Sequence, residues 1–123
     1  MKIIITEEQY KELSDWDIYS QLSPWLRRRM QYIDIKSSLE RHIKRSYEII
    51  LDDPDDATRR IIYKVIWDTF PRNSNVDYDE TEVEKYFDEL FPLIYGKYGE
   101  YVESEVDRIY SKGSFNPPYI HQL

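Results

Sequence analysis

Residues 79–112 carry the longest amphipathic pattern in this sequence. Apolar side chains recur every three or four positions along the stretch, which is the spacing with which an α-helix buries one face. Pro92 falls within the pattern, and Gly96 and Gly99 follow it. A proline inside a helix removes a backbone donor and collides with the preceding turn, and glycine lowers helix propensity. The pattern therefore predicts either one kinked helix or two consecutive helices that anchor the core.

The composition of the 123-residue chain is that of a folded domain with one hydrophobic core. Charged residues make up 33% of the sequence, but 12 Tyr, 4 Phe and 3 Trp supply bulky groups for burial, which a disordered chain of this charge would lack. The absence of cysteine excludes disulfides and is compatible with a reducing cytosol. The N-terminal apolar run is too short for a signal peptide, and no stretch approaches the roughly 18 apolar residues of a membrane span. We expect a cytoplasmic protein that does not enter a membrane.

Helix-capping patterns predict where the other helices begin. Thr6 followed by Gln9 forms a capping box, and Ser23 before Pro24 combines a capping side chain with a proline at the first helical position. Further helix starts are predicted at Ser14, Ser37, Asp53 and Thr81. Residues 32–35 are either extended or helical, so residues 24–50 form one bent helix or two.

These boundaries predict an all-α fold, a small helical bundle of four to six helices with short connections. Residues 1–5 are expected to form a short strand or an extended lead, with a strand pair between the termini as an alternative. A single helical domain spans residues 1–113, with Gly113 as its C-terminal cap. Residues 114–123 contain paired prolines and are expected to form a tail that is not helical.

The first thirteen residues, MKIIITEEQYKEL, resemble the opening of small uncharacterised proteins of tailed bacteriophages. The resemblance covers 13 of the 123 residues and includes no catalytic or binding residue. It implies a phage-encoded accessory protein that acts in a bacterial cytoplasm, and it implies no particular activity.

Charge is distributed unevenly along the sequence. The net charge is −7, yet residues 24–51 contain seven basic side chains against three acidic ones, and residues 77–107 contain eleven acidic side chains against two basic ones. Such segregation either pairs two segments within the fold or presents faces of opposite charge to partners.

The acidic stretch also holds several tyrosines, a combination typical of protein-binding surfaces. Tyrosine is enriched at interfaces, and an acidic face steers a basic partner toward it. We predict a non-catalytic protein-binding accessory protein, an inhibitor or modulator of a host protein, with mimicry of DNA charge as one specific form. The candidate contact residues are Tyr95, Tyr98, Glu100, Tyr101, Glu103 and Glu105. The alternative for each tyrosine is burial in the core, with the acids as a solvated rim.

The basic residues of the first segment offer an alternative function, nucleic-acid binding. They are Arg27, Arg28, Arg29, Lys36, Arg41, Lys44 and Arg45, with Trp25, Tyr32 and Tyr47 between them. Lys and Arg neutralise phosphates, and aromatic rings stack on unpaired bases. Three consecutive arginines on a helix, however, spread over about 200° of its circumference. Because the acidic segment can also neutralise the basic one, protein binding is the favoured function.

One polar segment resembles a calcium loop. The ligand positions of a twelve-residue loop fall on Asn73, Asn75, Asp77, Thr81 and Glu84. Tyr78, however, occupies the position that requires glycine in an EF-hand. The same residue types build turns and helix caps, so we predict a loop followed by a cap, with no metal.

A second acidic segment could bind magnesium, and its members are Asp52, Asp53, Asp55 and Asp56. Acids next to a proline at the first helical position are also what a helix N-terminus attracts without a metal. We favour that explanation and predict no metal and no cofactor.

Nothing in the sequence is typical of an enzyme. His42 and His121 are far apart, and neither accompanies a nucleophile motif such as GxSxG or a phosphate-binding GxxxxGK. Gly96 and Gly99 resemble the GxxG loop of a KH domain, but the acids around them would repel phosphate. We predict that the protein is not an enzyme.

Overall fold

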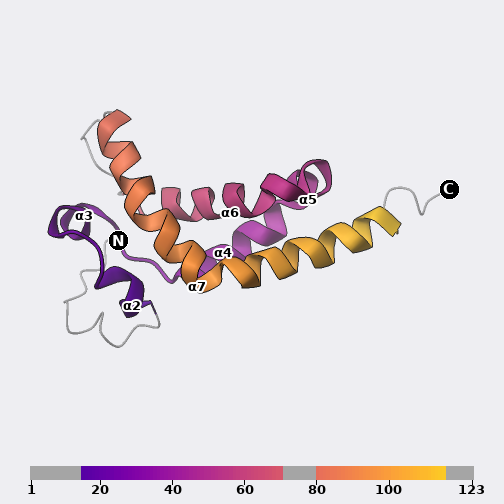
Figure 1. The fold of residues 1–123 in the computed structure, drawn as a ribbon, viewed down its shortest axis with the longest axis horizontal. Helices are drawn as coiled ribbons and strands as arrows, with labels where there is room; N and C mark the ends of the chain where they lie inside the picture. Colours follow the sequence, from indigo (N-terminus) through magenta and orange to yellow (C-terminus); the bar gives the residue numbers. More distant parts are fainter. Residues whose placement is uncertain (1–14, 71–79, 116–123) are drawn as a thin grey trace, which may run out of the picture.

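The computed structural model describes residues 15–70 and 80–115, and this part of the chain is mainly helical (Figure 1). Its helices are α2 (Trp16–Tyr19), α3 (Pro24–Arg29), α4 (Ile35–Arg45), α5 (Tyr47–Asp52), α6 (Pro54–Asp68) and α7 (Glu80–Phe115). The described residues form six helices and no strand, which confirms the predicted all-α fold. The strand expected at residues 1–5, the capping box at Thr6 and residues 116–123 of the expected tail lie outside the described residues. Ser114 and Phe115, which are expected in the tail, belong to α7, so the predicted boundary at residue 113 is wrong.

The longest helix, α7, is continuous and bent. It contains 36 residues with Pro92 inside it, and Figure 1 shows that it bends about midway. Pro92 has no N–H to bond the carbonyl of Asp88, and the loss of that bond favours a bend without ending the helix. The two-helix alternative is therefore wrong. Thr81 already lies within the first turn of α7 and Gly113 lies within its last turns, so the predicted capping roles of both residues are wrong.

The core lies where α4, α5 and α6 pack against α7. The buried side chains that α7 contributes are four residues apart, and they are Tyr86, Leu90, Ile94, Tyr98, Val102 and Val106. This stripe confirms the amphipathic pattern of residues 79–112. The fully buried side chains that surround it include Leu39, Ile50, Ile61, Ile62, Val65 and Ile66. Burial of each aliphatic side chain of this size contributes about 1.5–3 kcal/mol, so α7 supplies a large part of the hydrophobic stabilisation.

Ser23 and Asp34 cap the two helices that precede α5. The Ser23 hydroxyl accepts a hydrogen bond of 3.2 Å from the amide of Leu26, and Pro24 occupies the first helical position, as predicted. A non-helical segment separates α3 from α4, and Ser46 separates α4 from α5. Residues 24–50 therefore belong to three helices, and both alternatives, one bent helix or two, are wrong. The Asp34 carboxylate accepts a hydrogen bond of 3.2 Å from the amide of Ser37. Asp34 is therefore the cap of α4, and the prediction that Ser37 has this role is wrong.

A buried carboxylate, Asp15, connects α2, α4 and α7. Its side chain is only 2% exposed. Its Oδ2 accepts a hydrogen bond of 2.9 Å from the amide of Ile35, and its Oδ1 accepts one of 2.6 Å from the hydroxyl of Tyr98. Lys97 Nζ lies 3.5 Å from the same Oδ1. Burial and the bond to Asp15 raise the pKa of Tyr98, so its hydroxyl remains a donor at neutral pH.

A second carboxylate, Asp68, connects α6 to α4. Its Oδ2 lies 2.7 Å from Ser38 Oγ, 2.7 Å from Arg41 Nη2 and 2.8 Å from His42 Nε2. Burial would raise the pKa of Asp68, but the polar partners on α4 outweigh it and hold this pKa below its usual value. The cluster fastens α4 to the end of α6 through one ionised oxygen.

Candidate protein-binding surface

The six residues predicted to contact a partner lie on α7 but do not share one face. Tyr95 and Tyr101 are six positions apart, which places them about 120° apart around the helix. Tyr98 is 9% exposed, and its hydroxyl donates a hydrogen bond to Asp15. Tyr98 therefore belongs to the core. Four of the other residues divide between two flanks of α7, and Glu100 lies on the outer face between them.

The flank of α7 next to α4 carries Tyr101 and Glu105. The ammonium group of Lys36 lies 5.8 Å from the centroid of the Tyr101 ring, within the range of a cation–π contact. Burial and then the nearby Glu40 carboxylate raise the pKa of Tyr101. Glu105 accepts a hydrogen bond of 2.9 Å from Arg108, which lowers the pKa of Glu105. Basic side chains of the same chain thus already engage both residues.

The flank of α7 next to α6 carries Tyr95 and Glu103. Glu100 is exposed on the outer face of α7 beside this flank, about 60° from Glu103 around the helix. Tyr95 is 43% exposed, and its hydroxyl donates a hydrogen bond to Glu103, eight residues along the helix. This bond raises the pKa of Tyr95. The Tyr95 ring lies over Gly99, where an added Cβ would be 3.1 Å from a ring carbon. The missing side chain at Gly99 gives the ring room to lie along α7, so Tyr95 has a defined orientation at the surface.

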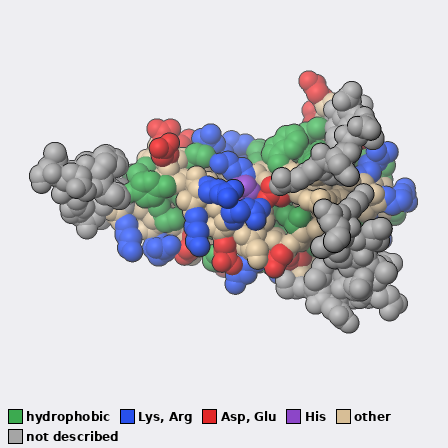
Figure 2. Space-filling model, turned by 180° about the vertical axis from the view of Figure 1, so that it is seen from behind, with side chains coloured by type: hydrophobic (Ala, Val, Ile, Leu, Met, Phe, Trp, Pro, Cys, Tyr) green, Lys and Arg blue, Asp and Glu red, His purple; other side chains and the backbone are tan. Residues whose placement is uncertain are grey.

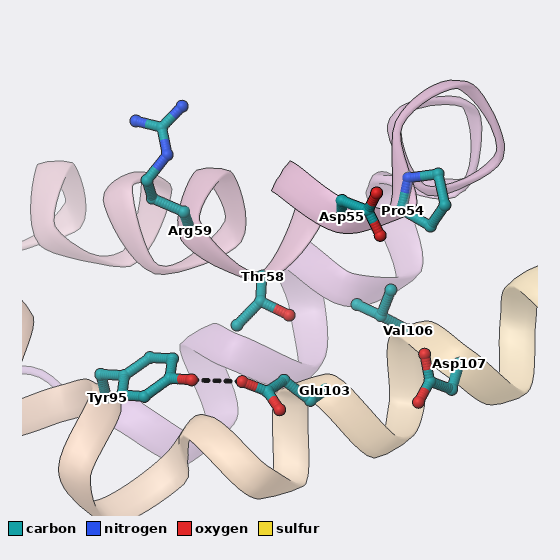
Figure 3. A pocket seen from close by; sticks show the side chains of 8 residues that line it. All are labelled: Pro54, Asp55, Thr58, Arg59, Tyr95, Glu103, Val106 and Asp107. Atoms are coloured by element: carbon teal, nitrogen blue, oxygen red, sulfur yellow. Dashed lines mark hydrogen bonds between the residues drawn. The ribbon is translucent and has the colours of Figure 1, made fainter.

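A hollow of about 290 Å³ opens between the beginning of α6 and the second half of α7 (Figure 3). Its lining consists of Pro54, Asp55, Thr58 and Arg59 from α6 and Tyr95, Glu103, Val106 and Asp107 from α7. In Figure 3 the hydroxyl of Tyr95 points at the carboxylate of Glu103 on the α7 side. The fixed tyrosine is therefore part of the wall of the hollow.

The hollow is negatively charged. Asp55, Glu103 and Asp107 contribute three carboxylates, and no Lys or Arg of the described residues forms an ion pair with any of them. Arg59 also lines the hollow, but its guanidinium donates hydrogen bonds of 2.7 and 2.8 Å to the two oxygens of Asp56. Figure 3 shows Arg59 pointing away from α7. The charge of the hollow therefore suits a basic group from another molecule.

An aromatic seam leads from the hollow along the junction of α6 and α7. Its members are, in order, Tyr95, Phe91, Tyr63, Phe87 and Trp67, and successive ring centroids are 5.9, 5.5, 4.9 and 5.4 Å apart. Such distances are typical of packed aromatic pairs. Trp67 is 52% exposed, and the three rings between it and Tyr95 are half-buried. The seam is thus a continuous apolar surface that ends at the negatively charged hollow.

The part of this surface on α6 is not identifiable from the sequence pattern. Phe87, Phe91 and Tyr95 repeat every four residues, which is a readable signal for three rings on one flank of a helix. Trp67, by contrast, follows the buried Ile66 in an apolar stretch, and helical spacing alone does not show that its ring is exposed.

The basic residues 27–45 are spread over α3 and α4, and several are engaged within the fold. Arg29 lies 3.5 Å from Glu82 of α7, and Arg41 lies 2.7 Å from Asp68 of α6. Arg28, Lys44 and Arg45 are exposed. Figure 2 shows Lys and Arg side chains interspersed with Asp and Glu, with one basic group beside the histidine. The face in Figure 2 does not present one continuous basic surface.

Neither candidate cation site is assembled within the described residues. Asn73, Asn75 and Asp77 lie outside them, whereas Thr81 and Glu84 lie in the first turns of α7. In residues 15–70 and 80–115, no three His, Asp or Glu side chains come close enough to hold a metal ion. The candidate magnesium ligands are Asp52, Asp53, Asp55 and Asp56. They lie on either side of Pro54, the first residue of α6, where they complement the positive end of the helix.

The structure also accounts for the two glycines of α7 and for His42. Gly96 and Gly99 lie within the continuous α7 helix, so they do not form a loop like that of a KH domain. His42 and Ser38 both hydrogen-bond to the same oxygen of Asp68. The Ser38 hydroxyl thus donates its hydrogen bond to the carboxylate and not to the histidine. The histidine does not activate this serine.

No protein-family model, curated protein or solved structure matches this chain. Within the part that the structure describes, no helix is long and apolar enough to cross a membrane. The hollow and its aromatic seam combine exposed rings with carboxylates that form no ion pair among the described residues, so this surface is the candidate functional site.

Proposed function

We propose that this chain is a non-catalytic accessory protein that binds another protein through the acidic, tyrosine-bearing flank of α7 next to α6. The contact residues are Tyr95 and Glu103 on this flank and Glu100 beside it, and the partner has a basic surface. One observation carries the proposal: Tyr95 is 43% exposed, yet its hydrogen bond to Glu103 fixes it. A ring that is already oriented loses little entropy on binding, and acidic neighbours steer a basic partner toward it.

The partner class is suggested by residues 1–13, which resemble small proteins of tailed bacteriophages. The resemblance supports a bacterial protein in the cytoplasm as the partner, with inhibition or modulation as the effect. A host protein that binds nucleic acid fits the charge, because carboxylates on the flank would occupy a basic surface that otherwise contacts phosphates.

Affinity capture from a bacterial lysate tests this proposal. Wild-type protein is compared with Glu100→Lys/Glu103→Lys, which reverses the charge of the flank. The control is Glu40→Lys/Glu48→Lys, which makes the same change in charge at exposed positions of α4 and α5. We expect proteins that wild type and the control retain and the flank variant loses. Recovery of the same proteins in equal amounts by all three would contradict the proposal.

Nucleic-acid binding through residues 27–45 is the competing function. The exposed Arg28, Lys44 and Arg45 favour it, whereas the ion pairs of Arg29 and Arg41 within the fold weigh against it. Fluorescence anisotropy of a labelled single-stranded oligonucleotide at about 50 and 200 mM salt measures it directly, because phosphate contacts weaken steeply with salt. Absence of a measurable, salt-sensitive affinity would remove this alternative.

A further inference from the structure

We infer that the segment bound by this protein is an amphipathic, arginine-bearing helix of the partner, which lies along the aromatic seam and places an arginine in the hollow. The inference rests on the proposed function, and it names the place and the chemistry of the contact. The apolar residues of the segment would cover Trp67 and Phe87, and its arginine would lie against Tyr95, Glu103 and Asp107.

The apolar end of the surface is set by Trp67. Trp67 is 52% exposed, and the centroid of its ring lies 5.4 Å from that of Phe87 in an edge-to-face arrangement. A large ring that is packed on one side and open on the other is the type of residue that anchors protein interfaces. This end of the seam therefore selects apolar side chains.

The charged end of the surface selects a large cation. Asp55, Glu103 and Asp107 line one hollow of about 290 Å³, yet among the described residues no three acids are close enough to hold a metal ion. Carboxylates spaced around a hollow suit a planar guanidinium, which offers five donors in fixed directions, better than a small ion or a point-like ammonium.

The chain itself shows how this surface binds an arginine. The guanidinium carbon of Arg59 lies 5.0 Å from the centroid of the Tyr63 ring, and two of its nitrogens bond the carboxylate of Asp56. An aromatic ring and a carboxylate together thus hold one arginine on α6. Tyr95 and Glu103 repeat that combination at the wall of the hollow.

The length of the surface fixes the length of the segment. From Trp67 to Asp55, α6 advances twelve residues, or about 18 Å at 1.5 Å per residue. A helix of about three turns covers that distance. The segment would therefore place its apolar residues and its arginine about two to three turns apart.

Selection of peptides from a random library displayed on yeast, with the full chain as target, tests the inference. We expect arginine to be enriched over lysine, with aromatic or aliphatic residues two to three turns away. Trp67→Ser and Asp55→Lys/Asp107→Lys should each weaken binding of a selected peptide by tenfold or more, as expected for a truncated anchor or a reversed charge pair. The Glu40→Lys/Glu48→Lys control should bind like wild type, and circular dichroism checks that every variant is folded.

The other outcomes of these experiments distinguish failure of the further inference from failure of the proposed function. Basic peptides that lose affinity with Glu100→Lys/Glu103→Lys but not with Trp67→Ser or Asp55→Lys/Asp107→Lys would overturn the seam and leave the proposed function in place. Selected peptides without a basic bias, or no selected peptides, would overturn both. A dimer of wild type in sedimentation that Trp67→Ser dissociates would identify a second copy as the occupant and overturn the inferred partner.

Discussion

The hydroxyl of Tyr98 donates a hydrogen bond of 2.6 Å to Oδ1 of Asp15, a residue 83 positions away in the chain. The contact fastens the middle of α7 to the beginning of α2. Because Asp15 Oδ2 also accepts the amide proton of Ile35, a single carboxylate serves three helices. A buried carboxylate is stable only where such donors replace water.

Asp15→Ala should therefore destabilise the fold more than Tyr98→Phe. The first change leaves the Tyr98 hydroxyl and the Ile35 amide without an acceptor, at a cost of about 3 kcal/mol, whereas the second removes one donor and costs about 1–2 kcal/mol. Urea unfolding measures both. The control is Asp17→Ala, which removes an exposed partner of Lys97 and should change stability by at most about 0.5 kcal/mol. Equal losses for Asp15→Ala and Asp17→Ala would show that the buried carboxylate has no special role.

The Asp68 cluster predicts a pH dependence in acid. Since the pKa of Asp68 in the fold lies below its ordinary value of 3.8, its ionised form stabilises the fold above that pH, and this contribution is lost as the pH falls through the lowered pKa. At pH 7, Asp68→Asn should reduce the free energy of unfolding by about 1–3 kcal/mol.

The difference between wild type and Asp68→Asn should shrink as the pH falls below the ordinary pKa of 3.8 and through the lowered pKa, because the carboxylate is then protonated first in the unfolded and finally in the folded protein. Urea unfolding at several values from pH 7 to pH 3 measures it. Asp52→Asn removes an exposed carboxylate of α5 and serves as the control. A difference between wild type and Asp68→Asn that is independent of pH would contradict the prediction.

Gly96→Ala should stabilise α7 more than Gly99→Ala. A Cβ added at Gly96 meets nothing within 4 Å, so alanine there improves helix propensity by up to about 1 kcal/mol. A Cβ at Gly99 would lie 3.1 Å from the Tyr95 ring, which must move. In a Tyr95→Ala background the ring is gone, and Gly99→Ala should regain the full benefit. Thermal unfolding of the four variants decides this, and an equal gain at both glycines in the wild-type background would show that the ring does not lie over Gly99.

Ser23 and Glu89 should be energetically coupled. The amide and the hydroxyl of Ser23 donate hydrogen bonds of 3.0 and 2.8 Å to the two oxygens of Glu89, so this pair fastens the beginning of α3 to α7. Ser23→Ala and Glu89→Ala should each cost about 1–2 kcal/mol, and the double variant should cost less than the sum. Strict additivity in a double-mutant cycle from urea unfolding would rule out the coupling.

Local chemistry accounts for most of what the sequence predicts correctly. The cap at Ser23 depends on residues within one turn. The buried stripe of α7 depends on the spacing of its apolar residues, which continues on both sides of the bend at Pro92. Tyr98 also falls at this spacing, so the sequence indicates its burial as an alternative to a role in partner contact. The sequence predicts Ser37 as the cap of α4, whereas Asp34 takes this role in the structure. Both residue types cap helices well, so capping preference alone does not separate them.

The features that escaped prediction depend on contacts between distant segments. The residues around Asp15 in the sequence do not indicate that its carboxylate accepts a hydrogen bond from Tyr98 of α7. The exposure of Trp67 depends on how α6 packs against α7. The division of the predicted acidic surface into two flanks follows from which helix lies on either side of α7. Periodicity identifies the buried face of a helix, but it does not say which neighbour covers each edge.

The position of α7 after α4, α5 and α6 in the sequence has a consequence for biosynthesis. Residues 90–106 leave the ribosome after α4, α5 and α6, whose apolar faces they cover. At about 5–20 residues per second, those faces remain uncovered for several seconds while translation continues. During this interval the apolar faces of α4, α5 and α6 are exposed in the nascent chain, and the core closes only after α7 has emerged.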